Sequence, residues 1–88
     1  MKSFCFISSF GRNLKKNTGI IPNKDNLAYI KMMLQNSDPY TKYDEKGRHS
    51  SYYTFILEEK LITVVVDADT NKVLTAVIET HRRGWNGN

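Results

Sequence analysis

Residues Ser50–His81 read SSYYTFILEEKLITVVVDADTNKVLTAVIETH and hold most of the strand-forming side chains of the chain. Aromatic and β-branched residues concentrate in three segments of this stretch, Tyr52–Leu57, Leu61–Asp67 and Val73–Thr80. Such segments favour β-strands, because branched and aromatic side chains pack well on a pleated surface. The stretch therefore predicts three consecutive antiparallel strands.

The two connectors between these strands differ in turn chemistry. In the second connector, Asp67 can cap a tight turn with its carboxylate, and Asn71 tolerates a left-handed backbone. The first connector, Glu58–Lys60, contains no Gly, Asn or Pro. The sequence therefore specifies the second hairpin more strongly than the first.

Alternation along the last strand predicts which side chains share a face of the sheet. Two faces result, one with Leu74, Ala76 and Ile78, and the other with Val73, Thr75, Val77, Glu79 and His81. The middle strand is almost continuously apolar, which suits a strand covered on both faces. Three strands alone are marginally stable in water, so the first half of the chain must supply a cover.

The best helical pattern in that first half is Asn26–Asn36. Leu27, Ile30 and Leu34 form its apolar stripe, and Ser37-Asp38-Pro39 ends it because proline cannot continue a helix. We expect this stripe to face the side of the sheet that carries Leu74, Ala76 and Ile78.

The remaining segments predict smaller elements. Lys2–Ser8 is expected to be an additional N-terminal strand, and Arg12–Lys16 a short helix with Ser8 or Ser9 as its cap and Gly19 after its end. Tyr40–Gly47 is polar and turn-prone. The fold class expected is α+β, in a single domain over residues 1–88: a small antiparallel sheet covered by one or two helices.

Composition narrows the classes of protein to consider. The 88 residues carry a formal net charge of +4, which favours a polyanionic partner. The single cysteine, Cys5, cannot form an intramolecular disulfide, and no apolar run has the length of a membrane span. We therefore expect a cytoplasmic protein with no membrane association.

No metal or cofactor site is expected from the sequence. Cys5 lies far from both histidines, and the chain has no phosphate-binding glycine loop. Asp67 and Asp69 lack the glycine and the distal glutamate of a calcium loop, so turn capping explains them better.

Histidine and arginine gather at the ends of the strand block, as Arg48-His49 before it and His81-Arg82-Arg83 after it. Imidazole moves protons near neutral pH, and guanidinium groups hold phosphate. Together these groups suit metal-free RNA cleavage, in which a ribose 2′-hydroxyl attacks the neighbouring phosphate. Tyr52, Tyr53 and Trp85 offer surfaces on which bases can stack. The alternative, that these residues are ordinary surface and that Trp85 packs the tail, stays open.

Two segments resemble a known family. Lys60-Leu-Ile-Thr-Val-Val-Val-Asp67 is similar to the middle strand of HigB-type messenger-RNA interferases, and Val73–His81 is similar to their last strand, which also ends in Thr-His. The phrase VVVDADTNKVLTAVIE equally resembles a hairpin of RNase domains on polymorphic bacterial toxins. The expected order of a short strand, helices and a meander looks like the RelE-type toxin fold of the barnase–EndoU–colicin–RelE ribonucleases.

This resemblance implies an endoribonuclease of bacterial, plasmid or phage type, with His81 as general acid or base and His49 as its partner. It implies phosphate binding by Arg48, Arg82 and Arg83, and base stacking by Tyr53 and Trp85. Lys15 and Lys16 would add RNA contacts from the basic surface. The partners implied are RNA, including ribosome-bound messenger RNA, and a cognate antitoxin or immunity protein.

Two alternatives from other classes remain. One is a non-catalytic regulator that binds RNA or a protein through its basic rim. The other is an antitoxin or immunity protein, which would use a sheet edge and exposed aromatic residues.

Overall fold

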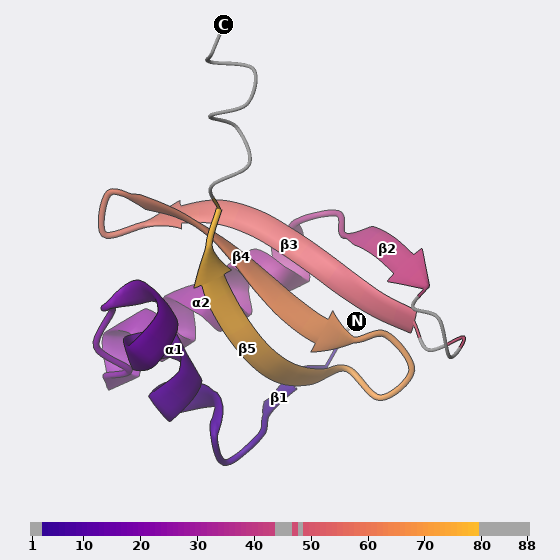
Figure 1. Cartoon of the computed structure of the whole chain (residues 1–88), viewed down its shortest axis with the longest axis horizontal. Coiled ribbons are helices and arrows are strands. Elements are labelled where there is room, and N and C mark those ends of the chain that lie inside the picture. The colour runs from indigo at the N-terminus through magenta and orange to yellow at the C-terminus, as the bar shows by residue number, and fades with distance from the viewer. Residues whose placement is uncertain (1–2, 44–46, 48, 80–88) are drawn as a thin grey trace, which may run out of the picture.

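A computed structural model of the chain describes residues 3–43, 47 and 49–79. These residues form one five-stranded sheet and two helices (Figure 1). The sheet order is β1-β5-β4-β3-β2, with β1 parallel to β5 and the other pairs antiparallel. In chain order, the elements are β1 (Cys5–Phe6), α1 (Phe10–Thr18), α2 (Lys24–Asn36), β2 (Tyr40–Tyr43), β3 (His49–Leu57), β4 (Lys60–Asp67) and β5 (Lys72–Ile78). The α+β class and the three-stranded meander are confirmed.

The β4–β5 connector folds as its residues predict. One carboxylate oxygen of Asp67 accepts hydrogen bonds from the backbone N–H groups of Asp69 (2.9 Å) and Thr70 (3.2 Å). Asn71 has φ 59°, the left-handed conformation expected of it.

The β3–β4 hairpin closes through only two residues, although neither is a typical turn former. Glu58 and Glu59 both have left-handed backbones, with φ 54° and 66°. This is the pattern of a type I′ turn, which usually takes Asn-Gly. The antiparallel ladder from Ser50↔Asp67 to Leu57↔Lys60 therefore holds the hairpin, rather than its turn sequence.

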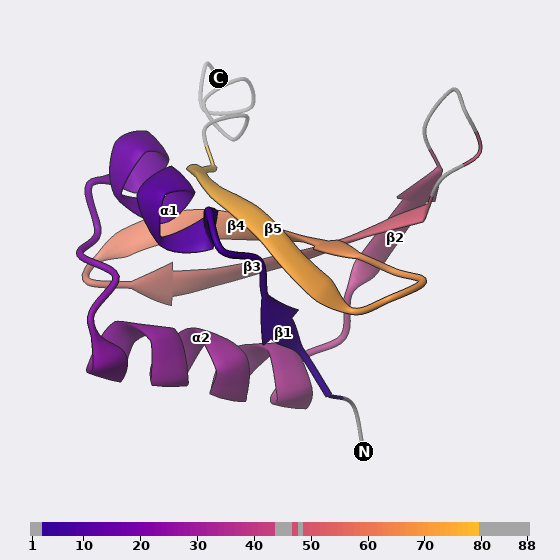
Figure 2. The ribbon, with the colours of Figure 1, turned by 90° about the horizontal axis from the view of Figure 1, so that it is seen from below.

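The hydrophobic core lies between one face of the sheet and the two helices. Cross-strand neighbours on this face include Tyr53, Val64 and Ala76. α1 packs chiefly on β5, whereas α2 runs along β3 (Figure 2). The predicted stripe of α2 is confirmed, since Ile30 and Leu34 are fully buried and Leu27 is half-buried. The largest fully buried side chains are Phe10, Leu14, Ile20, Ile30, Leu34, Ile62, Val64, Val66 and Val73.

A β-bulge changes the face assignment of β5. Val66 pairs with Val73 but Val65 pairs with Thr75, so Leu74 is an extra residue in the ladder. Val73 is fully buried, and Leu74 is only half-buried. The prediction that Leu74 faces the core is wrong, because the bulge interrupts the two-residue alternation. Ala76 and Ile78, beyond the bulge, lie on the core face as predicted, but the helix packed on β5 is α1 rather than α2.

The helix ends are set by local capping. The side-chain oxygen of Asn23 accepts a hydrogen bond from the Asn26 N–H (2.8 Å) at the start of α2. Gly19, with φ 79°, follows α1 as predicted, and its N–H donates to the Lys15 carbonyl oxygen. Ser9 occupies the N-cap position of α1 without a side-chain hydrogen bond, so a serine hydroxyl cap is not formed there.

The two short strands differ most from expectation. Tyr40–Tyr43, part of a segment expected to be a loop, pairs with Tyr52–His49 and forms β2. β3 presents a row of backbone groups at its edge, and pairing satisfies them despite the polar sequence. The N-terminal strand is confirmed but is limited to Cys5–Phe6, which pairs with Lys72 and Val73.

Candidate functional site

The residues predicted to form a site fall into two groups. His49, Tyr53, Lys15 and Lys16 belong to the part of the chain that the structure describes. The others lie outside the described residues: Arg48, His81, Arg82, Arg83 and Trp85.

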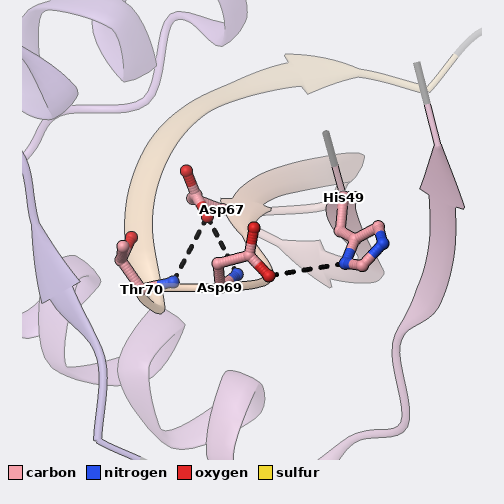
Figure 3. Close-up of polar contacts among 4 residues, drawn as sticks. All are labelled: His49, Asp67, Asp69 and Thr70. Carbon is pink, nitrogen blue, oxygen red and sulfur yellow. Dashed lines mark hydrogen bonds and ion pairs between the residues drawn. The ribbon is translucent and has the colours of Figure 1, made fainter. Parts of the chain in front are cut away.

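His49 begins β3 and lies beside the β4–β5 turn. Its Nδ1 is 3.4 Å from a carboxylate oxygen of Asp69 (Figure 3). Its backbone carbonyl oxygen accepts a hydrogen bond from the N–H of Ala68 (3.2 Å). The Asp67 carboxylate holds the turn that presents Asp69, so the position of this pair depends on the connector. Protonation of His49 makes the contact an ion pair, and an exposed pair of this kind contributes at most about 1 kcal/mol.

The described end of β5 lies at the opposite end of the sheet from His49. The N–H of Glu79 donates to the carbonyl oxygen of Leu61 (2.9 Å), whereas His49 is bonded to Ala68. Leu61 and Ala68 are seven positions apart on an extended strand, a separation of roughly 20 Å. The described residues therefore do not bring His49 close to the point from which the chain continues to His81.

Lys15 and Lys16 lie at the same end of the molecule as Glu79. Both are exposed on the last turn of α1. That turn is fixed against β5, because the side-chain amide of Asn17 donates to the carbonyl oxygen of Ala76 (3.1 Å). The Lys60 ammonium group donates to the carbonyl oxygen of Thr18 at the end of the same helix (2.9 Å). Three lysines thus lie on or beside the α1 turn that packs against β5.

Tyr53 does not offer a stacking surface. Its side chain is only 3% exposed, and its ring packs edge-on against Phe4 at a centroid distance of 6.0 Å. Burial raises the pKa of the Tyr53 phenol above its usual value, and the nearby Asp38 carboxylate raises it further. The stacking role expected of Tyr53 is therefore corrected to a role in the core.

Two further tyrosines, one half-buried and one exposed, lie on the opposite face of the sheet. Tyr52 points away from the core, and its β2 neighbour Tyr40 is 68% exposed. Their ring centroids are 6.5 Å apart. Strand alternation shows that Tyr52 and Tyr53 face opposite sides, but the pattern around them did not identify the buried one. Tyr40 was missed because its segment was expected to be a loop.

Three polar side chains form a hydrogen-bonded row across this outer face. The Thr63 hydroxyl donates to a carboxylate oxygen of Glu79 (3.0 Å), and it lies 3.0 Å from the Thr54 hydroxyl. Because Thr63 uses its proton on Glu79, Thr54 is the donor in the second contact. This row fixes the Glu79 carboxylate two residues before His81 in the sequence.

Residues 3–43, 47 and 49–79 contain no group of three or more His, Cys, Asp or Glu side chains arranged to hold a metal ion. Neither of the two helices in this part of the chain is long and apolar enough to cross a bilayer.

Comparison with known proteins gives no relative. The chain matches no protein-family model, no curated protein and no solved structure.

Proposed function

We propose that this protein is a metal-independent endoribonuclease of the RelE-like type, acting in the cytoplasm as a toxin or as a phage or plasmid effector. His81 is its general acid or base, and Arg82 and Arg83 bind the scissile phosphate. The internal 2′-hydroxyl of the RNA is the nucleophile, and the products are a cyclic phosphate and a free 5′-hydroxyl.

The observation that carries this proposal is where β5 ends. Glu79, the described residue that follows β5, lies near the α1 turn that bears Lys15 and Lys16. The sequence continues from there into Thr80-His81-Arg82-Arg83. Positive charge at this end suits a phosphate backbone, whose contacts with lysine and arginine dominate nucleic-acid affinity.

The order of elements adds support. A short strand, two helices and an antiparallel meander follow one another along the chain, as expected for the RelE-type group. His49 lies at the other end of β4 from Glu79 and from the lysines of α1. A phosphate bound by those lysines is therefore far from His49, which favours His81 as the main proton-transfer residue. In this proposal His49 has no catalytic role, because it lies at the other end of β4 from Glu79.

The test is cleavage of single-stranded RNA by the purified full chain in the presence of a chelator. We expect a 2′,3′-cyclic phosphate product, and a loss of about 10²–10⁴-fold in turnover for His81→Ala. His49→Ala is the matched control and should retain most of the activity. Wild-type turnover in the His81→Ala protein would overturn the assignment.

A second candidate function is a binding regulator without catalysis. It is favoured by the exposed Tyr40 and the half-buried Tyr52 on the face of the sheet away from the helices, because aromatic rings on a sheet can stack bases or bind a protein. Salt-sensitive RNA binding without cleavage, weakened by Tyr40→Ala, would support it. If the chain is instead an antitoxin or immunity protein, it should bind a protein, and added RNA should not change that binding.

A further inference from the structure

One edge of the sheet is open over a short stretch of β3. β2 covers β3 only from His49 to Tyr52. In an antiparallel ladder, alternate residues direct their N–H and C=O groups to opposite sides of the strand. Leu57 and Lys60 flank the two-residue turn and bond to each other, so Thr54 and Ile56 direct their backbone groups away from β4.

These outward backbone groups are almost unused. Among the described residues, the phenol of Tyr29 donates to the Ile56 carbonyl oxygen (3.1 Å), and no hydrogen bond pairs the N–H or C=O of Thr54 or the N–H of Ile56. β2 begins at Tyr40, opposite Tyr52, and does not extend to this stretch. The unpaired groups match the backbone of another extended strand.

At the other end of the sheet, the outer side of β5 is largely paired. β1 pairs with the start of β5, and the side chains of Asn13 and Asn17 bond to the carbonyl oxygens of Leu74 and Ala76. Natural sheets protect their edges in such ways, since an unprotected edge recruits other strands. Among the described residues, the cover of the β3 edge between Thr54 and Ile56 is limited to the bond from Tyr29 to the Ile56 carbonyl oxygen.

The side chains at the open edge indicate what would bind there. Ile56 is 61% exposed, so an apolar residue lies at the centre of the stretch. Exposed carboxylates lie at both ends. Asp38 comes two residues before Tyr40, which pairs with Tyr52. Glu58 and Glu59 form the turn after Leu57, and one carboxylate oxygen of Glu58 also accepts a hydrogen bond from the Asn26 side chain (2.9 Å). This edge is acidic, although the chain as a whole has a net charge of +4.

We propose that the β3 edge at Thr54–Ile56 binds an extended segment of a partner polypeptide as an added strand. The segment has apolar or β-branched residues at its centre and basic residues on either side. Backbone hydrogen bonds supply the register, Ile56 supplies the apolar contact, and the three carboxylates select the basic flanks. The inference does not depend on the proposed ribonuclease activity.

The test uses two synthetic peptides with blocked ends, KTVTVTK and ETVTVTE, and the full chain. Amide hydrogen exchange is followed residue by residue. We expect KTVTVTK to slow exchange at the amides of Thr54 and Ile56 by at least about tenfold at saturation. ETVTVTE should bind about tenfold more weakly, and the affinity for KTVTVTK should fall as salt is raised.

Two matched variants distinguish binding at the β3 edge from non-specific binding of the peptide. Ile56→Lys places a charge at the open edge and should lower the affinity for KTVTVTK by about tenfold or more. Val77→Lys changes a similar β-branched residue, 39% exposed, on the same face but on β5, and should leave the affinity unchanged. Neither residue is buried, so both variants should fold.

Three results would overturn the proposal. One is unchanged exchange at Thr54 and Ile56 with KTVTVTK. Another is equal binding by the Ile56→Lys and Val77→Lys proteins. The third is protection of these two amides that rises with protein concentration in the absence of peptide, because the edge would then be occupied by a second copy of the chain.

Discussion

The side-chain amide of Asn13 donates a hydrogen bond to the backbone carbonyl oxygen of Leu74 at 3.1 Å, across 61 positions of sequence. One helical turn later, Asn17 makes the same bond to Ala76. β1 pairs with β5 only at Lys72 and Val73. Beyond that point, two asparagines on one side of α1 take the place of a neighbouring strand. They position α1 and also remove an edge that would otherwise attract other chains.

Replacing Asn13 with alanine should lower the free energy of unfolding by about 1 kcal/mol, because the Leu74 carbonyl loses its partner. Urea denaturation measures this change. Asn36→Ala is the control, since Asn36 is exposed and bonds only to the Met32 carbonyl oxygen of its own helix. If both variants have the same stability, the contact between α1 and β5 contributes nothing measurable.

The bulge at Leu74 predicts an unusual order of stability losses. Val73→Ala removes buried methyl groups and should cost about 2 kcal/mol, whereas Leu74→Ala removes more atoms but from a half-buried position, and should cost less. Thermal or urea unfolding compares the two proteins directly. A larger loss for Leu74→Ala would mean that β5 follows simple alternation.

The raised pKa of Tyr53 predicts weaker stability at alkaline pH. Below pH 10 the phenol is protonated in both the folded and the unfolded chain, and its contribution is fully present. Above pH 10 the unfolded chain loses this proton first, so folding stability falls as pH rises toward the folded pKa. We expect Tyr53→Phe to reduce this alkaline loss when unfolding is measured from neutral pH to above pH 10. An identical pH dependence in both proteins would contradict the prediction.

The β3–β4 turn predicts a stabilising substitution. Glu59 has φ 66°, a conformation that glycine adopts without steric cost. Glu59→Gly should therefore raise the free energy of unfolding by roughly 0.5–1 kcal/mol. Glu59→Ala keeps the Cβ atom and should give no such gain. Equal stabilities of the Gly and Ala variants would show that removal of the carboxylate, rather than backbone strain, decides the outcome.

The sequence by itself determined those features that depend on neighbouring residues. The Asp67–Asn71 turn, the left-handed Gly19 after α1 and the apolar stripe of α2 follow from interactions within a few positions. The three C-terminal strands follow from their composition, since β-branched side chains favour extended backbone locally. This was enough to predict the α+β class and the meander.

Only the tertiary structure decided the features that depend on contacts between distant segments. The bulge at Leu74, the strand Tyr40–Tyr43 and the choice of Tyr53 rather than Tyr52 for the core all depend on which backbone lies opposite. The tertiary structure also decided how far apart the candidate site residues lie, since His49 and the end of β5 are at opposite ends of β4. Alternation along a strand groups the residues that share a face. Which face is buried, which register is adopted and which strand lies at the edge depend on pairing with distant segments, and the local sequence does not specify those partners.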